Sequence, residues 1–289
     1  EFPKVTFVEK TEVQIEPTVS KLQNKEELIV KTYEIDENTA APVVLIAEDN
    51  LELRKVLKES LSTYTIVEAS NGQEAIELAI KYIPAIVITD LMMPDVDGFE
   101  LIELLKGDFR TSHIPIVVTS ALSEVQHRID ALDKGASAFI PKPFNLKEVK
   151  LQIANLIDLQ DKEASKRSEH WMEYKQNLSK KDQEFIERLN EIIDEKLSQE
   201  HLSVEELSQI FGISRVQLHR KVTALCGCSA SVYVKRYKLA HAAEWLRKDS
   251  LNISDVAYSL GYSSLAHFSR NFKKEFNMSP KEYRNTLDK

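Results

Sequence analysis

Residues 86–98, Ile-Val-Ile-Thr-Asp-Leu-Met-Met-Pro-Asp-Val-Asp-Gly, decide the fold of the first half of the chain. They begin with an apolar run that predicts a strand buried on both faces, and this run ends in the carboxylate of Asp90. A helix is expected to begin at Asp97-Gly98, because Asp is a good N-cap residue and Gly permits a tight turn. The stretch therefore predicts a strand, a loop and a helix, with an acidic side chain at the carboxyl end of the strand.

The same alternation extends in both directions along the chain. We predict strands at 43–47, 64–68, 85–89, 115–119 and 137–140, and helices at 51–62, 71–82, 98–106, 123–133 and 145–158. Five such β–α units in about 120 residues favour a parallel, doubly wound α/β sheet. In sheets of this kind, ligands bind outside the carboxyl ends of the strands.

Polar side chains follow the predicted strands at the point where each strand ends. Glu48 and Asp49 follow the first strand and Asp90 ends the third, while Ser120 ends the fourth and Lys142 follows the fifth. Three crowded carboxylates repel one another unless a cation joins them, and oxygen ligands suit Mg²⁺. A divalent cation together with Lys142 could offset the charge of a phosphoryl group. Asp90 is then the best-placed nucleophile, giving an aspartyl-phosphate.

Residues 42–158 resemble the receiver domain of two-component response regulators. The matching residues are Glu48-Asp49, Asp90, the loop Met92-Met93-Pro94-Asp95-Val96-Asp97-Gly98, Ser120-Ala121 and Lys142-Pro143-Phe144. The resemblance implies a flavodoxin-like fold with five parallel strands, and a Mg²⁺ site made by Glu48, Asp49, Asp90 and the backbone carbonyl of Met92. It also implies that Asp90 accepts phosphate from a histidine kinase, that Ser120 moves towards the phosphoryl group, and that the ring of Phe139 changes its burial. The family more often has tyrosine at that position, so any hydrogen bond from a ring hydroxyl is lost.

Charge and composition separate the two halves of the chain. Residues 201–289 carry 14 Lys and Arg against 8 Asp and Glu, whereas the residues before them carry 24 against 38. A basic second half is expected where only that half touches nucleic acid. No apolar run approaches the roughly 20 residues that a membrane span needs. Cys226 and Cys228 are too close for an ordinary disulfide and are expected to be reduced.

Four segments are expected along the chain. Residues 1–41 carry no motif and are interpreted as a linker or as the remnant of a preceding domain. The receiver domain is expected over 42–160, a polar linker over 161–181, and an all-α domain over 182–289. The linker contains no Gly or Pro and could be helical and continuous with the preceding helix.

A helix-turn-helix pattern begins after Leu202. Ser203 and Ser214 are the expected N-caps of its two helices, and Gly212 separates them. On the second helix, the residues expected to face inward are Leu218, Val222 and Leu225. The opposite side carries Val216, His219, Arg220 and Thr223, with Arg215 and Lys221 at its flanks. Such a helix enters the major groove of DNA, where Arg pairs with guanine.

The pattern recurs about fifty residues later, from Ile253 to Ser263. The helix that follows is expected to bury Leu265, Phe268, Phe272 and Phe276, and to leave Ala266, Ser269, Arg270 and Lys273 outward. As a helix, residues 229–248 would hold the two units about 30 Å apart. One turn of DNA is about 34 Å, so two recognition helices could enter successive major grooves.

Residues 184–287 are similar to the AraC family of bacterial transcription regulators. The matching stretches are 257–262, 268–276 and 279–284. The resemblance implies an all-α domain with tandem helix-turn-helix units. It further implies that bases are read by Val216, His219 and Arg220 in the first unit and by Ala266, Ser269 and Arg270 in the second.

These features together predict a transcription regulator that binds double-stranded DNA and is phosphorylated by a histidine kinase, in cis or in trans. It is not expected to be an enzyme beyond its own phosphorylation and dephosphorylation, and its expected location is the cytoplasm. The receiver resemblance implies a homodimer on phosphorylation, and RNA polymerase is a further expected partner.

Three alternatives stay open. The receiver could have ceased to accept phosphate, or it could act as a phosphate sink with the helices as an adaptor that binds no DNA. The chain could also be the C-terminal part of a hybrid sensor kinase tethered to the membrane.

Overall fold

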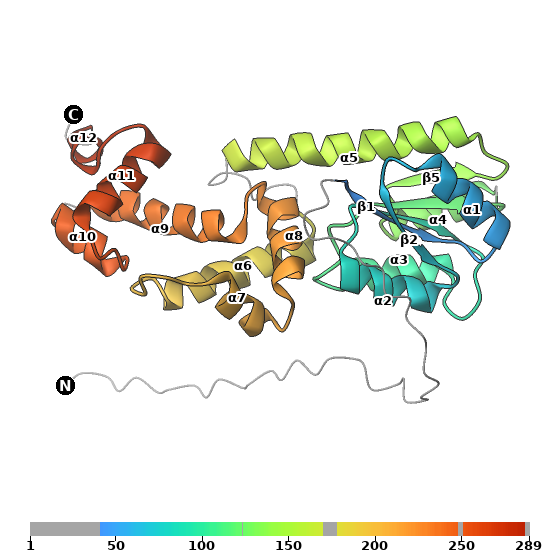
Figure 1. Ribbon diagram of the computed structural model, residues 1–289, viewed down its shortest axis with the longest axis horizontal. Coiled ribbons are helices and arrows are strands. Elements are labelled where there is room, and N and C mark those ends of the chain that lie inside the picture. Colours follow the sequence, from blue (N-terminus) through green and yellow to red (C-terminus); the bar gives the residue numbers. More distant parts are fainter. Residues whose placement is uncertain (1–40, 123, 170–177, 248–250, 287–289) are drawn as a thin grey trace, which may run out of the picture. The chain divides into compact units, whose positions relative to one another are not determined.

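A computed structural model describes residues 41–122, 124–169, 178–247 and 251–286 (Figure 1). The predicted N-terminal segment 1–41 lies outside the described residues except for Ala41, and so do residues 170–177 of the predicted linker. None of the described helices is long and apolar enough to cross a membrane.

The first half of the described chain alternates strands and helices. In chain order its elements are β1 (Val43–Ala47), α1 (Leu51–Ser60), β2 (Thr65–Ala69), α2 (Gly72–Tyr82), β3 (Ile86–Asp90), α3 (Gly98–Gly107), β4 (Ile116–Ser120), α4 (Val125–Asp133), β5 (Ala138–Pro141) and α5 (Leu146–Glu169). The strands form one parallel sheet in the order β2-β1-β3-β4-β5, with β3 at its centre. Helices α1 and α5 cover one face of the sheet, and α2 and α3 cover the other (Figure 1). The predicted doubly wound fold with five parallel strands is confirmed.

The register of the strands brings their carboxyl ends level. All five residues of β1, β3 and β4 are buried, as expected for apolar strands covered on both faces. Asp90 pairs with Thr119, and Ser120 pairs with Pro141. The polar residues at and after these strand ends therefore emerge at a single edge of the sheet.

Polar side chains start the helices at this same edge. The side chains of Asn50, Asn71 and Asp97 cap α1, α2 and α3, each accepting hydrogen bonds from backbone N–H groups of the first turn. Residue 123, at which the fourth helix was predicted to begin, lies outside the described residues, and α4 begins at Val125. Short polar turns after the strands therefore set where these helices begin.

Helix α5 runs to Glu169, past the predicted end at residue 158. Val149 and Ile153 pack into the apolar core that α5 shares with the sheet. Farther along the helix, the Ser168 carbonyl oxygen accepts a hydrogen bond from Arg236 Nη1 at 2.8 Å. The C-terminal part of α5 therefore contacts the helical half of the chain.

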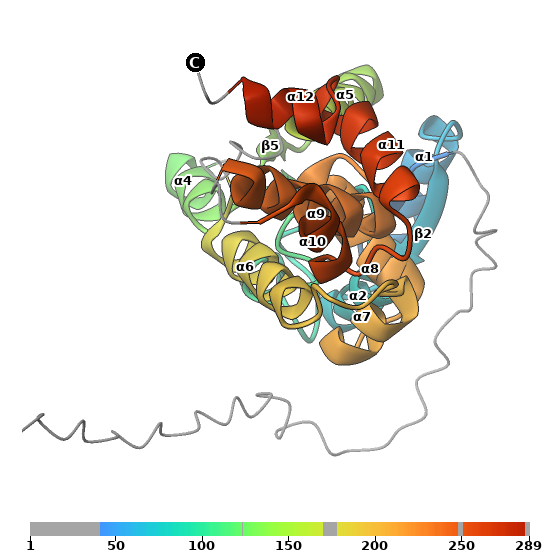
Figure 2. The same cartoon turned by 90° about the vertical axis from the view of Figure 1, so that its left-hand side faces the viewer.

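The second half of the described chain is helical. Its elements are α6 (Lys180–Glu195), α7 (Val204–Phe211), α8 (Arg215–Cys226), α9 (Ala230–Arg247), α10 (Ile253–Ser259), α11 (Leu265–Phe276) and α12 (Pro280–Asn285). Two apolar cores stabilise it, one around α6, α7 and α8 and the other around α9, α10 and α11. The pairs α7–α8 and α10–α11 are the two helix-turn-helix units, and α10 and α11 gather at the C-terminal end of α9 (Figure 1 and Figure 2).

The inward-facing residues of α8 and α11 largely follow the predicted pattern. Leu218, Val222, Phe268 and Phe272 are each fully buried. The prediction for Leu265 was wrong, because this side chain is 37% exposed. It is the first residue of α11 and does not belong to the second core, whereas the two phenylalanines do.

Candidate functional site

The predicted acidic residues meet at the carboxyl edge of the sheet. One carboxylate oxygen from each of Glu48, Asp49 and Asp90 lies within 4.8 Å of the other two. Glu48 and Asp90 are buried, at 2% and 6% exposed, whereas Asp49 is exposed and opens the cluster to solvent. The fold therefore brings together three carboxylates from the ends of two neighbouring strands.

Lys142 links two of these carboxylates. Its ammonium donates to Glu48 Oε2 at 2.9 Å and to Asp90 Oδ2. Burial raises the pKa of Glu48 by more than the hydrogen bond from Lys142 lowers it. Burial alone would lower the pKa of Lys142, but the hydrogen bonds to Asp90 and Glu48 raise it above its ordinary value. A single ammonium thus contacts two of the three acidic side chains, and the cluster retains an excess of negative charge.

The donor chemistry of this cluster fits Mg²⁺. Three carboxylates from one exposed and two buried residues offer hard oxygen atoms, which magnesium prefers, and Mg²⁺ commonly keeps several waters as further ligands. Excess negative charge around Asp90 also favours a cation there. Glu48, Asp49 and Asp90 are accordingly the residues that could hold the ion.

Two further predicted residues border the cluster. The backbone N–H of Met92 donates to Asp90 Oδ1 at 3.2 Å, while the Met92 side chain is 59% exposed. Ser120 is fully buried at the end of β4, and its Oγ accepts a hydrogen bond from the N–H of Leu122 at 3.2 Å. Both residues therefore lie at the same edge of the sheet as Asp90.

Phe139 lies on β5, three residues before Lys142, and is half-buried. The Lys142–Pro143 peptide bond that follows β5 is cis. The structure thus places the ring of Phe139 at the border between core and solvent, on the strand that leads to Lys142.

A close backbone contact sets the shape of the loop after Asp90. A Cβ atom on Gly98 would overlap the Asp90 carbonyl oxygen and would lie 2.6 Å from the Cα of Leu91. The N–H of Gly98 donates to the Leu91 carbonyl at 3.0 Å, which closes the loop. Gly98 was predicted as a turn residue, but its larger role is to let α3 begin directly against the backbone of the Asp90 strand.

The predicted DNA-contacting residues of α8 differ in their environment. Arg215 and His219 are exposed, whereas Val216 and Arg220 are half-buried. Arg215 Nη1 lies 3.4 Å from Glu205 Oε2 on the neighbouring helix α7. Arg220 Nη1 donates to the backbone carbonyl of Tyr82 at the end of α2. One of the predicted base-reading side chains is thus engaged by the receiver half of the chain.

On α11, the predicted residues form one surface. Ala266, Arg270 and Lys273 are exposed and Ser269 is half-buried. They lie opposite the buried rings of the second core, so the helix presents a polar and basic side to solvent.

The burial of Lys221 was not predicted from the sequence. It was expected at the flank of α8, but its side chain is 1% exposed and its ammonium donates to Asp182 on α6. Burial lowers the pKa of Lys221, and the charge of Asp182 only partly offsets this effect. The Ser179-x-x-Asp182 capping pattern could have indicated the start of α6, but nothing in the sequence joins Asp182 to Lys221.

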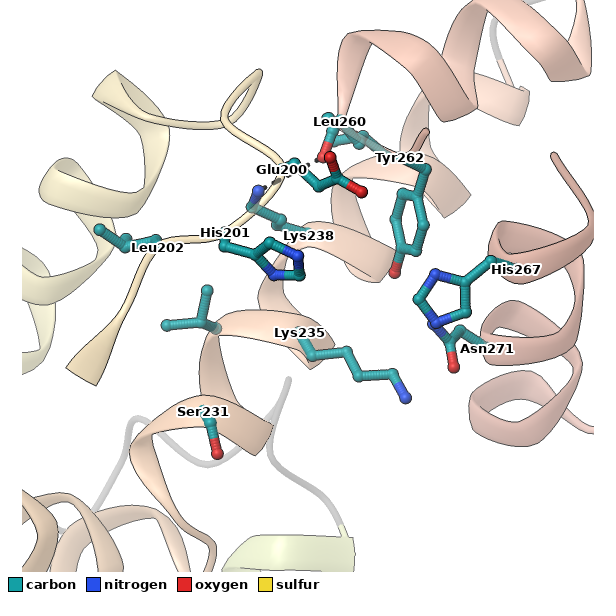
Figure 3. Close-up of a pocket in the computed structure, with 12 residues that line it drawn as sticks. Glu200, His201, Leu202, Ser231, Lys235, Lys238, Leu260, Tyr262, His267 and Asn271 are labelled. Carbon is teal, nitrogen blue, oxygen red and sulfur yellow. Dashed lines mark hydrogen bonds between the residues drawn. The ribbon is translucent and has the colours of Figure 1, made fainter. Parts of the chain in front are cut away.

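A hollow with a volume of about 270 Å³ lies between the two helix-turn-helix units (Figure 3). Residues of α9 and α11, including Lys235, His267 and Asn271, line it together with His201 before α7. Lys238 donates to the carbonyl oxygens of Gln199 and Leu260, at 2.5 and 3.3 Å, and so ties the two units together. We interpret this hollow as part of the junction between the units.

Two family models match the chain. The model described as a response regulator receiver domain matches residues 44–154, and the model described as a helix-turn-helix domain matches residues 207–286. The first match contains the acidic cluster and Lys142, and the second contains α8 and α11.

Individual proteins are also similar to the chain. Histidine kinase P4 of Formosa agariphila is 33% identical over 245 residues, which are 84% of this chain and 18% of that protein. The probable transcriptional regulator ycf27 of Guillardia theta is 37% identical over 123 residues, or 42% of this chain and 47% of that protein. The solved receiver domain of the Francisella response regulator 1452 is 26% identical, with a TM-score of 0.39, and covers 40% of this chain and 97% of that one. The chain spans less than two thirds of the length of these two curated relatives.

Proposed function

Because the chain joins a response regulator receiver domain to an AraC-type helix-turn-helix domain, we propose that it is a transcription regulator switched by phosphorylation of Asp90. The observation that carries this proposal is the position of Asp90. It ends the central strand β3, within 4.8 Å of two further carboxylates and in contact with Lys142.

The chemistry proposed at Asp90 is phosphoryl transfer from a phosphohistidine. An oxygen of Asp90 attacks phosphorus, an O–P bond forms, the N–P bond breaks, and the imidazole leaves with the bonding electron pair. Mg²⁺, held by Glu48, Asp49, Asp90 and the Met92 carbonyl, would neutralise charge on the phosphoryl oxygens. Lys142, which now donates to Asp90, is within reach to donate to a phosphoryl oxygen instead, and Ser120 would donate to another.

The proposed output is binding of double-stranded DNA by α8 and α11. Arg215, Val216, His219 and Arg220 would contact one major groove, and Ala266, Ser269, Arg270 and Lys273 the next. A histidine kinase as phosphate donor, a homodimer formed on phosphorylation and contact with RNA polymerase belong to the same proposal.

The phosphoacceptor is tested by intact mass spectrometry after incubation with acetyl phosphate and Mg²⁺. We expect one phosphoryl adduct that is lost on acid treatment and that is absent from Asp90→Asn. Asp95→Asn is the matched control, because Asp95 is exposed in the same loop and its φ of 67° suits asparagine equally well. Equal adduct in the wild type and in Asp90→Asn would show that another residue accepts the phosphate.

DNA binding separates the main proposal from the phosphate sink. A sink with an adaptor domain would take up phosphate at Asp90 but would enrich no duplex from a random-sequence pool. A regulator would enrich one, and its affinity would fall steeply with salt because contacts to DNA phosphates dominate it.

A second candidate is that the chain works as the C-terminal part of a hybrid histidine kinase. The observation that favours it is the match to Histidine kinase P4, in which 84% of this chain aligns with 18% of that protein. In that setting the phosphate donor would lie in cis. A kinase in trans would phosphorylate Asp90 at a rate that depends on kinase concentration. A donor in cis would phosphorylate it at a rate that is independent of protein concentration.

A further inference from the structure

We propose that helix α2 of the receiver holds the first recognition helix α8 and competes with DNA for its side chains. This inference rests on the proposed DNA-binding function and concerns how that function is restrained. Gln217 Nε2 donates to the carbonyl oxygen of Ile80 at 2.6 Å, and Arg220 donates to that of Tyr82. Both acceptors lie in the last turn of α2.

The end of α2 is well suited to hold these two side chains. The last four carbonyl groups of a helix have no partner within the helix, and they carry negative partial charge. The guanidinium of Arg220 and the amide of Gln217 therefore act as a C-terminal cap for α2. Arg220 cannot cap α2 and reach a base edge in the major groove at the same time, so the two contacts exclude each other.

A second contact fixes the same flank of α8. Lys221 Nζ donates to Ser112 Oγ at 3.1 Å, and Ser112 lies in the turn before β4. The ring of Phe109, in the same turn, lies 6.2 Å from the ring of Phe185 on α6 and 6.5 Å from that of Phe211 on α7. Residues 217, 220 and 221 share one side of α8, so the receiver covers a continuous strip along the first recognition helix.

Helix α2 also touches the loop that follows the proposed phosphoacceptor. A Cβ on Gly72, the first residue of α2, would overlap the carbonyl oxygen of Val96. One helix thus contacts the Asp90 loop through its first residue and α8 through its last turn. A shift of this loop when Asp90 is phosphorylated would move α2 and free the carbonyls from Gln217 and Arg220.

Gln217→Glu is the variant that tests the contact. It retains the capping box of α8, since its side chain still accepts from the Ser214 N–H, which lies 2.7 Å away. It removes the donor to Ile80 and sets a carboxylate against the negative end of α2. Gln209→Glu adds the same charge at an exposed position of α7 and is the matched control.

The probe is a labelled duplex enriched from a random-sequence pool by wild-type protein with beryllofluoride and Mg²⁺. Without beryllofluoride, we expect Gln217→Glu to bind this duplex about fivefold more tightly than Gln209→Glu, the factor that one lost hydrogen bond gives. With beryllofluoride, the two variants should bind equally. Added negative charge alone predicts weaker binding, so an affinity of Gln217→Glu no higher than that of the control would overturn the proposal.

Reciprocity supplies a second readout. If DNA and α2 compete for α8, the duplex must raise the affinity for beryllofluoride by the same factor by which beryllofluoride raises the affinity for the duplex. Fluorine NMR titration with and without the duplex measures this, and equal beryllofluoride affinities in both titrations would contradict the inference. Enrichment of no duplex by the wild type would instead overturn the proposed function, and this inference with it.

Discussion

Lys221 and Asp182 show how a single buried pair stabilises the first helix-turn-helix unit. Their side chains are 1% and 5% exposed, and Ser112 Oγ accepts from Lys221 and donates to Asp182. Each charge is tolerated in the interior because the other is present. Removal of one partner leaves the remaining charge buried without compensation, which is strongly destabilising.

Asp182→Asn should therefore lower the free energy of unfolding by roughly 3 kcal/mol at neutral pH, because Lys221 stays buried without a counter-charge. Urea unfolding measures the change. Glu184→Gln on the same helix is the matched control, because its partner Lys181 is 3.5 Å away and both side chains are about half exposed. Its expected effect is below about 0.5 kcal/mol. Similar losses for both variants would contradict a special role for the buried pair.

The same pair gives a pH dependence with a defined sign. Burial would raise the pKa of Asp182, but the neighbouring Lys221 ammonium and the hydrogen bonds to Asp182 hold it below its ordinary value of 3.8. The stabilisation is therefore fully present well above pH 3.8, and it is lost as the pH falls through 3.8 and on through the lower pKa of the folded state. We expect the difference in unfolding free energy between the wild type and Asp182→Asn to stay constant from pH 7 to about pH 5 and to narrow below the ordinary pKa of an aspartate. A difference that widens on acidification would rule this account out.

Among the elements, α3 offers a comparison between its two terminal glycines. Gly98→Ala should destabilise the receiver by roughly 1–3 kcal/mol, because the new Cβ would meet the backbone of Asp90 and Leu91. Gly107→Ala at the other end meets nothing within 4 Å and should be neutral or slightly stabilising. Urea unfolding compares the two variants. We also expect slower phosphorylation of Gly98→Ala, since the backbone that holds Asp90 must shift.

Sequence patterns predicted the secondary structure elements, and they predicted a residue's contacts where its partner lies close along the chain or is fixed by strand register. The proximity of Asp90 and Lys142 could be predicted, because each residue stands at the end of a short apolar strand and parallel strands end at the same edge of the sheet. The full length of α5 was left open, because its last residues are polar and nothing in the sequence marks the helix end; the structure shows that the helix continues to Glu169. The burial of Lys221 could not be foreseen, since its partner Asp182 is 39 residues away and on another helix.

At the scale of the whole molecule, the two recognition helices are expected to contribute unequally before phosphorylation. Helix α11 presents Arg270 to solvent, whereas Arg220 of α8 is engaged by α2. Arg270→Ala should therefore weaken DNA binding by roughly 1–3 kcal/mol both with and without beryllofluoride. Fluorescence anisotropy with the enriched duplex measures the loss. Lys281→Ala removes an exposed positive charge on α12 and is the control. An equal loss of DNA affinity in this variant would mean that Arg270 acts only through its positive charge and not through a specific contact.

Helix α5 is unbroken from Leu146 to Glu169 and packs against the sheet near one end and against the helical half near the other. Along such a helix, every inserted residue adds about 1.5 Å and turns everything beyond it by about 100°. Two extra residues between these contacts would turn the far end to nearly the opposite azimuth, whereas seven would restore the original azimuth to within about 20°. The lengths that this segment can adopt in working proteins should therefore be periodic, with insertions of about seven, eleven or eighteen residues permitted because each returns the far end to within about 20° of its original azimuth.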